Sequence, residues 1–309
     1  MPSAGENLNR RTFLKKSLSV SGAGLVAAAS FEERALLAHA AGPSPAAPDP
    51  PAQGLPLGAL GKLKVSRLIC GGNLFDGYAH SRNLIYVSRL MREYFTAEKI
   101  MDTLELCEQS GVNTVIALCG RHMLDVLGRY RKERGGKIQW LAQALPAVND
   151  MTNVKLAIDN GAAGAFVQGG VGDRLVGDGR LDTVGKFLDL VKENGLVAGV
   201  GGHALKVPQD VEAHGLKPDF YFKTVNGVGY SSQPPAEVAA VMKPIARPWI
   251  AFKVLGAGAV KPQEGFQSAF ALGADFLCVG VFDFQVKEDV KIVTDLLSGG
   301  LPRERPWRS

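Results

Sequence analysis

Two strand-like runs, Phe220-Tyr221-Phe222-Lys223-Thr224-Val225 and Trp249-Ile250-Ala251-Phe252-Lys253-Val254-Leu255, flank a segment of helical period at 235–245. Short apolar runs separated by a helix of about ten residues are typical of a βαβ unit with two parallel strands. Parallel strands are buried on both faces, which explains the near-continuous apolar character of both runs. Each run nevertheless carries a lysine near its end.

The same unit recurs along the chain from residue 65. The strand-like runs lie at 65–70, 114–118, 139–145, 163–168, 196–200, 219–225, 248–255 and 275–281. Segments of helical period follow them at 96–110, 121–134, 152–160, 181–194, 206–214, 235–245, 261–272 and 285–298. Eight βα units with no further elements predict an α/β fold, a single-domain (β/α)8 TIM barrel. An open doubly wound sheet is the alternative, but no GxGxxG follows the first strand.

The first forty residues have the pattern of an export signal. Asn9-Arg10-Arg11-Thr12-Phe13-Leu14-Lys15-Lys16 holds a twin arginine, a short apolar stretch follows, and Ala38-His39-Ala40 has the form of a cleavage site. This pattern predicts a twin-arginine signal peptide at 1–40 and a periplasmic or extracellular protein. Residues 41–56 are rich in Pro and Ala and are expected to be a disordered linker. The barrel domain is expected at 57–300 and a C-terminal tail at 301–309.

Composition excludes several classes of protein. The formal net charge is +5, but the body of the chain has no basic run interleaved with aromatic residues, so no nucleic-acid partner is expected. The apolar part of the signal is too short for a membrane span. The four cysteines form no Cys-x-x-Cys pair, which argues against zinc-ribbon and thioredoxin-like proteins. A small-molecule substrate is the expected partner, and the sequence does not indicate an oligomeric state.

Barrel enzymes place their chemistry where strands end and βα loops begin. Those positions hold Asn73, Asp76, Cys119, Gln143, Gln168, His203, Lys223, Lys253 and Asp283. The insert at 76–95 adds Tyr78, His80, Arg82 and Tyr86 and is a natural lid or substrate loop. We expect substrate binding by Asn73, Asp76, His80, Arg82, Gln143 and Gln168. The expected catalytic residues are Lys223, Lys253, His203 and Asp283.

The two lysines allow a specific chemistry. Strand alternation predicts that Phe222, Phe252 and Val254 face the covering helices and that Tyr221, Lys223, Ala251 and Lys253 face inward. Burial lowers a lysine pKa, and a neutral amine attacks a carbonyl to form a Schiff base. Two alternatives stay open: an ion pair of the lysines with Asp283 or Asp76, and simple binding of an anionic substrate.

The lysine strands resemble a known family. Pro218 to Thr224, followed by Phe252-Lys253-Val254-Leu255-Gly256-Ala257-Gly258, is similar to the sixth and seventh strands of class I aldolases of the deoxyribose-phosphate type. The resemblance implies that one lysine forms a Schiff base and the other tunes it. Those enzymes hold a phosphate after strands seven and eight, where this chain has Gly280-Val281-Phe282-Asp283-Phe284. A carboxylate between two phenylalanines is a poor phosphate site.

A second resemblance involves the start of the barrel. Leu57 to Asn73 resembles the N-terminal hairpin and first strand of aldo-keto reductases, and Ala97 to Thr114 continues the likeness. It implies a barrel and leaves NADP open as a cofactor. The catalytic tetrad of that family is absent: no carboxylate lies near 116–118 and the tyrosine has no counterpart. Gln143 stands at the position of the lysine, and Gln168 or Gly169 at the position of the histidine.

A divalent metal is the other cofactor left open. Asp76, His80 and His203 are its candidate ligands, as in barrel sugar isomerases, although no HxH or HxxE pair exists. Two glycine-rich stretches, 169–174 and 199–202, are expected to be tight turns or anion-binding loops. The prediction is therefore an exported barrel enzyme with lyase or isomerase chemistry on a small carbonyl or sugar-derived substrate. The alternatives are an aldo-keto-reductase-like oxidoreductase with an altered site, a metal-dependent isomerase or epimerase, and a non-catalytic ligand-binding barrel.

Overall fold

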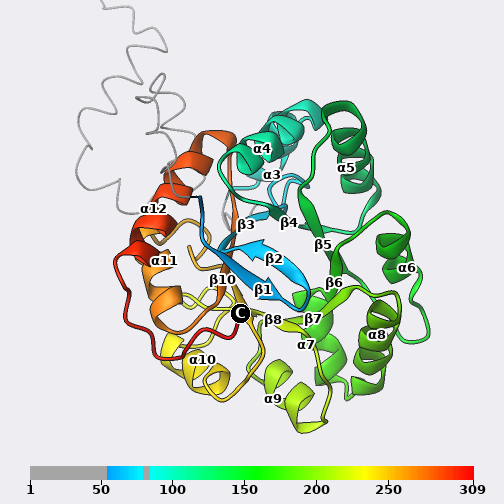
Figure 1. The fold of residues 1–309 in the computed structure, drawn as a ribbon. Coiled ribbons are helices and arrows are strands. Elements are labelled where there is room, and N and C mark those ends of the chain that lie inside the picture. The colour runs from blue at the N-terminus through cyan, green and yellow to red at the C-terminus, as the bar shows by residue number, and fades with distance from the viewer. Residues whose placement is uncertain (1–53, 79–83) are drawn as a thin grey trace, which may run out of the picture.

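The computed structural model describes residues 54–78 and 84–309. The predicted signal peptide, most of the predicted linker, His80 and Arg82 lie outside these residues. Eight parallel strands close into a barrel in the order β10-β3-β4-β5-β6-β7-β8-β9, with helices around it, which confirms the α/β TIM-barrel prediction (Figure 1). The strands are β3 Leu68–Gly71, β4 Thr114–Leu118, β5 Gln139–Ala144, β6 Gly164–Val167, β7 Val197–Gly202, β8 Phe220–Thr224, β9 Trp249–Phe252 and β10 Phe276–Gly280.

Eight helices follow the strands in the expected places. They are α4 Ala97–Gln109, α5 Arg121–Arg134, α6 Thr152–Asp159, α8 Leu181–Glu193, α9 Lys206–Ala213, α10 Pro235–Met242, α11 Pro262–Ala271 and α12 Val286–Ser298. Two more, α3 Val87–Tyr94 and α7 Gly169–Gly177, were not expected, and a short 3₁₀ turn, η1 Asp283–Gln285, precedes α12. None of the helices in the described parts of the chain is long and apolar enough to cross a membrane.

Helix α7 corrects the prediction of a glycine-rich loop at 169–174. Gln168 caps the helix by accepting a hydrogen bond from the N–H of Val171 (3.0 Å). Glycine is a poor helix former, and for that reason the pattern indicated a loop. Here it is needed for packing, because a Cβ on Gly172 would lie 1.9 Å from the carbonyl oxygen of Gly201 on β7. The glycines therefore let α7 lie directly against the strand.

The inward and outward faces of β8 are the reverse of the prediction. Phe220 and Phe222 belong to the cluster that fills the barrel, whereas Tyr221 packs with the helices. Both faces of a parallel strand are apolar, so alternation alone does not tell them apart. The polar group of Tyr221 marks the outer face, because its hydroxyl donates to Glu212 on α9 (2.8 Å) while the wholly apolar Phe220 and Phe222 fill the interior. Lys223, which shares a face with Tyr221, therefore points out of the barrel.

The first barrel strand is also shorter than the predicted run at 65–70. The chain forms an antiparallel hairpin, β1 Leu57–Leu60 with β2 Leu63–Ser66, before β3 begins at Leu68. Arg67 breaks the run because its N–H donates to the carbonyl oxygen of Pro56 (2.9 Å). The hairpin lies across the amino-terminal end of the barrel, as the resemblance to aldo-keto reductases implied (Figure 1).

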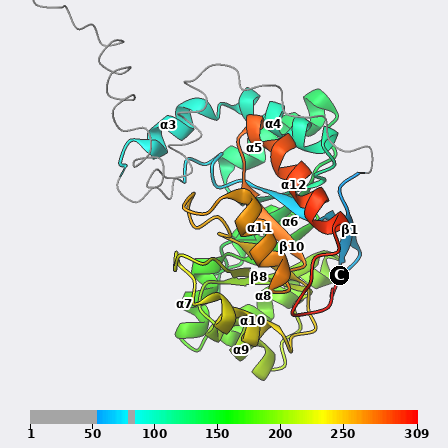
Figure 2. The same cartoon turned by 90° about the vertical axis from the view of Figure 1, so that its left-hand side faces the viewer.

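The segment after α12 packs against the same end of the barrel. Arg305 and Asp275 form an ion pair at 2.7 Å, and both side chains are fully buried. Arg67 and Arg303 lie over the ring of Trp307, at 4.1 and 3.4 Å from its centre. The predicted tail is thus held against the barrel floor, and Figure 2 shows this end opposite the end that carries α3.

Candidate functional site

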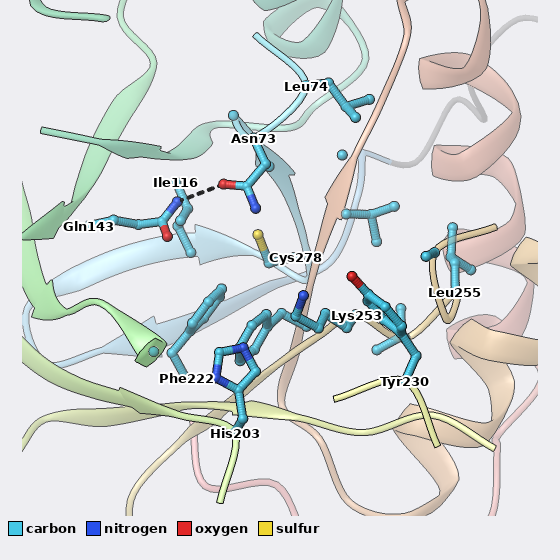
Figure 3. A pocket seen from close by; sticks show the side chains of 18 of the residues that line it. Asn73, Leu74, Ile116, Gln143, His203, Phe222, Tyr230, Lys253, Leu255 and Cys278 are labelled. Atoms are coloured by element: carbon cyan, nitrogen blue, oxygen red, sulfur yellow. Dashed lines mark hydrogen bonds between the residues drawn. The ribbon is translucent and has the colours of Figure 1, made fainter. Parts of the chain in front are cut away.

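A cavity of about 320 Å³ opens at the carboxyl ends of the strands. Its apolar lining includes Phe222, Phe252, Leu255 and Val279. Its polar lining comes from Asn73, Gln143, Gln168, His203, Tyr230 and Lys253. Figure 3 shows Asn73 and Gln143 across the cavity from His203, Lys253 and Tyr230. Of the ten residues predicted for the site, the structure brings together five: Asn73, Gln143, Gln168, His203 and Lys253.

Lys253 is the one lysine or arginine among the described residues that line the cavity. It lies just beyond the end of β9 in the left-handed region (φ 57°), which is uncommon for a side chain of this size. Burial lowers the pKa of Lys253 to about 8. Its ammonium lies 4.6 Å from the ring centre of Tyr230, and none of the ion pairs among the described residues includes it. The unusual backbone turn therefore directs the lysine into the cavity without a counter-charge.

Aromatic rings form one wall of the cavity. Phe222 and Phe252 are stacked, with ring centres 3.9 Å apart and planes 12° from parallel. The imidazole of His203 meets the Phe252 ring edge-on at 5.3 Å. These rings exclude water from the region of Lys253, which is the physical cause of its lowered pKa.

His203 is oriented by an aspartate that the sequence analysis did not select. Asp173 on α7 contacts the Nδ1 atom of His203 at 2.7 Å and accepts the backbone N–H groups of His203 and Ala204. Burial acts to raise the pKa of Asp173, but these hydrogen bonds and the charge of His203 outweigh it and hold that pKa below its ordinary value. Asp173 was missed because it follows the glycines that indicated a loop.

Amide side chains supply the opposite side. The Nε2 atom of Gln143 donates to the Oδ1 atom of Asn73 (3.3 Å), which joins β5 to the end of β3. Gln168 combines two roles, because it lines the cavity and caps α7. An amide both donates and accepts hydrogen bonds. This side of the cavity therefore matches neutral polar groups such as hydroxyls.

Lys223 lies outside the cavity and is 1 % exposed. Its ammonium donates to the carbonyl oxygen of His203 (2.6 Å), and both oxygens of Thr224 and the side-chain oxygen of Gln233 are within 3.3 Å. Burial lowers the pKa of Lys223 to about 8, and the charge of Asp173 opposes that shift. Lys223 thus ties the end of β7 to β8 and to the loop that follows it.

Two predicted carboxylates lie apart from the cavity lining. Asp283 pairs with Lys99 (2.9 Å) and accepts the hydroxyl of Tyr94 (2.6 Å), so it does not pair with either strand lysine. Burial acts to raise the pKa of Asp283, but these two partners hold it below the ordinary value. Burial raises the pKa of Asp76 to about 6, although the charge of His122 opposes the shift.

The described residues do not present a fitted cofactor site. Within 54–78 and 84–309 no group of three or more His, Cys, Asp or Glu side chains is placed to hold a metal ion. Asp76 is not among the residues lining the cavity, and His203 is engaged by Asp173. NADP carries a diphosphate and a 2′-phosphate. Among the described residues that line the cavity, Lys253 is the single lysine or arginine. One cation is too few for three phosphate groups, so this lining does not fit NADP.

Known structures share this fold. A protein described as an aldo-keto reductase from Pseudomonas aeruginosa matches with a TM-score of 0.56 and 18% identity, over 78% of this chain and 94% of that one. The aldo-keto reductase AKR11C1 from Bacillus halodurans matches with a TM-score of 0.54 and 12% identity, over 77% and 91%. An N-acetylmannosamine-6-phosphate 2-epimerase from Clostridium perfringens matches at 0.45 and 16%, over 74% and 91%.

The two aldo-keto reductases, at such identities, show the fold alone. No protein-family model and no curated protein matches the chain. The function must therefore be argued from the site, since one barrel fold supports many chemistries.

Proposed function

We propose that this protein is a barrel enzyme that acts on a small carbonyl compound through a Schiff base on Lys253, as a lyase or an isomerase. The observation that carries the proposal is the position of Lys253, a lysine without an ion-pair partner among the described residues, in a cavity with an aromatic wall. An amine whose pKa is lowered to about 8 is partly neutral at physiological pH and is then a nucleophile.

The bond changes are those of imine formation. The neutral Nζ atom of Lys253 attacks the carbonyl carbon, so a C–N bond forms and the C=O π bond breaks. The nitrogen then loses one proton and the former carbonyl oxygen takes one, which gives a carbinolamine. A second proton lets that oxygen leave as water, which yields a protonated imine. The imine withdraws electrons from the neighbouring carbon, so a C–H or C–C bond there can break with the electron pair retained by the conjugated nitrogen.

His203 is the candidate group for these proton transfers. Its Nδ1 atom is engaged by Asp173, so the other ring nitrogen, Nε2, is left for the substrate. Asp173 stabilises the imidazolium that forms when His203 accepts a proton, as an aspartate does in a catalytic triad. Tyr230 lies beside the Lys253 ammonium and faces the same cavity.

Lys223 does not take the nucleophile's role in this proposal. Its ammonium points away from the cavity and is used to hold the carbonyl oxygen of His203. It therefore supports the acid–base group, while Lys253 bonds to the substrate. The twin-arginine pattern at 10–11, outside the described residues, supports an exported location for the enzyme.

Borohydride trapping tests the proposal. The protein is incubated with glycolaldehyde, glyceraldehyde or dihydroxyacetone, sodium borohydride reduces the imine, and the mass gain is located by peptide mass spectrometry. We expect a single adduct on Lys253 that Lys253→Ala abolishes. Lys243→Ala, an exposed lysine on the helix layer, is the matched control and keeps the adduct. Absence of an adduct with every compound, or an adduct on another lysine that survives Lys253→Ala, would overturn the proposal.

A further inference from the structure

The charge of the cavity wall restricts what this site can bind. Among the described residues that line it there is no arginine and no carboxylate, and Lys253 is the one lysine. In the proposed function that lysine is bonded to the substrate carbonyl. A phosphate or carboxylate elsewhere on the substrate would then be buried without a counter-charge, which is costly.

In the first turn of α7, two backbone N–H groups are already engaged and a carboxylate lies close by. At the amino end of α7, which borders the cavity, the N–H of Val171 bonds the side-chain oxygen of Gln168 and the N–H of Gly172 bonds its backbone oxygen. The carboxylate of Asp173 adds negative charge to the same turn. A helix amino terminus attracts anions only when its N–H groups are available and no like charge is near.

The turns after β9 and β10 are engaged in the same way. The N–H groups of Gly256 and Gly258 donate to the carbonyl oxygens of Lys253 and Leu255, within their own loop. After β10, the N–H of Phe282 donates to the side-chain oxygen of Gln285 (3.2 Å). The next residue is the carboxylate Asp283. Neither turn therefore offers a cradle for a phosphate.

The lining instead suits a neutral, hydroxylated molecule. Asn73, Gln143 and Gln168 present amides, which donate to and accept from hydroxyls. Phe222 and Phe252 present an apolar surface for the C–H groups of the same molecule. The volume, about 320 Å³, lies at the lower end of the range for ligand sites, roughly 300–1,000 Å³.

We infer that the substrate of this site is an uncharged polyhydroxy aldehyde or ketone no larger than a monosaccharide, and that phosphate esters and keto acids are excluded. The inference rests on the proposed function, because it assigns to the carbonyl the one lysine found among the described residues of the lining. It assigns a role to each part of the lining. Lys253 bonds to the carbonyl carbon, the amides form hydrogen bonds with the hydroxyls, and the phenylalanines pack against the carbon chain.

Matched pairs of compounds test the inference. Adduct formation by the full protein is measured with D-erythrose and D-erythrose 4-phosphate, with pyruvate, and with butanal, which lacks hydroxyls. The concentration that gives half-maximal trapping should be at least about tenfold lower for D-erythrose than for each of the other three compounds. A tenfold difference is the effect expected from the loss of one or two hydrogen bonds or from one unpaired charge. Equal or tighter trapping of the phosphate ester or of pyruvate would overturn the inference and leave the Schiff base standing.

A binding measurement separates this inference from the chemistry. Erythritol and erythritol 4-phosphate cannot form an imine, and saturation-transfer NMR reports whether each binds the intact protein. Erythritol binding without any trapped adduct would retain the substrate class and remove the Schiff base. Binding of erythritol 4-phosphate but not erythritol would overturn the substrate class directly.

A pair of variants tests the role of the amides. Gln143→Met replaces the amide by an apolar side chain of similar length, and we expect the half-saturating concentration of erythrose to rise about tenfold while that of butanal stays within about twofold. Gln139→Met is the matched control on the same strand, because Gln139 bonds Lys64 at the opposite end of the barrel. Equal effects of Gln143→Met on erythrose and butanal would contradict the assignment.

Discussion

Cationic side chains are buried at both ends of the barrel, and the two ends differ in the groups that lie next to the charge. At the floor, Arg305 is paired with Asp275, and Arg67 and Arg303 lie over Trp307. At the mouth, Lys253 has a tyrosine ring beside it and takes part in none of the ion pairs found among the described residues. The buried arginines of the floor are thus paired or stacked, whereas Lys253 at the mouth has no ion-pair partner among the described residues.

The choice of cation matches this difference. An arginine stays charged, so it must be paired, and its planar group can stack and donate in several directions. The carboxylate of Asp275 accepts hydrogen bonds from the guanidinium of Arg305, from the backbone N–H of Trp249 and from the backbone N–H of Arg308. A lysine can lose its proton instead, and burial at the mouth lowers the pKa of Lys253 to about 8. In the proposed function the neutral amine at the mouth reacts with the substrate, while the charged pairs of the floor stabilise the fold.

Breaking the floor should have the largest effect on folding. Asp275→Asn removes the counter-charge of a fully buried ion pair, and we expect the free energy of unfolding to fall by about 3–5 kcal/mol. Guanidinium unfolding followed by circular dichroism measures it. Asp125→Asn, at an exposed position on α5, is the control and should change stability by less than about 0.5 kcal/mol. A loss below about 1 kcal/mol in Asp275→Asn would contradict the structural role of the pair.

The same substitution at the two strand lysines should have different results. Lys223→Met removes the ammonium that donates to the carbonyl oxygen of His203 and to the oxygens of Thr224, and should lower the free energy of unfolding by about 1–3 kcal/mol. Lys253→Met removes a desolvated cation and should leave stability unchanged or raise it. Both are measured by guanidinium unfolding at pH 7. Equal losses at the two sites would show that both lysines are structural.

Removing the charge that orients His203 should slow the chemistry with little effect on stability. We expect Asp173→Asn to reduce the rate of adduct formation with glyceraldehyde about tenfold to a hundredfold, because the imidazolium loses its partner. Asp178→Asn, at the exposed end of the same helix, is the matched control. An unchanged rate in Asp173→Asn would remove His203 and Asp173 from the proton transfers.

The smallest effect is a displacement of the pH profile. The lowered pKa of Lys253 means that the neutral amine predominates above about pH 8 rather than above the ordinary value of about 10.4. The rate of adduct formation should therefore rise between pH 6 and 8 and level off above 8. His203 and Tyr230 face the same cavity, so the pH profile is also measured in the variants His203→Gln and Tyr230→Phe. A rate that keeps rising to pH 10 would mean that Lys253 is an ordinary lysine.

The pattern of the sequence predicts the barrel well because its signal is repeated. Each strand is an apolar run between a helix and a loop, so an error in one unit leaves the other seven intact. The errors occur where one interaction overrides a local preference. Arg67 interrupts the strand predicted at 65–70, because its N–H donates to the carbonyl oxygen of Pro56. The glycines of 169–177 form a helix because β7 lies against them.

The site is predicted in part for a related reason. Asn73, Gln143, Gln168, His203 and Lys253 were found because a barrel brings strand ends together whatever the side chains are. Asp173 and Tyr230 were not selected, since one lies on the unexpected helix and the other in the long connection between β8 and α10. Asp283 was expected beside the lysines, but Lys99 and Tyr94 on neighbouring elements hold it instead.

Local chemistry along the chain is therefore enough to specify eight βα units and the edge of the barrel at which polar side chains gather. It does not specify which lysine enters the cavity. Lys223 and Lys253 occupy similar places on neighbouring strands, and both are desolvated. Packing separates them: the phenylalanines of β8 fill the barrel and turn Lys223 outward, whereas the left-handed turn after β9 brings Lys253 in. Side-chain packing and backbone geometry in three dimensions decide this, because alternation along an apolar strand carries no information about which face is the interior.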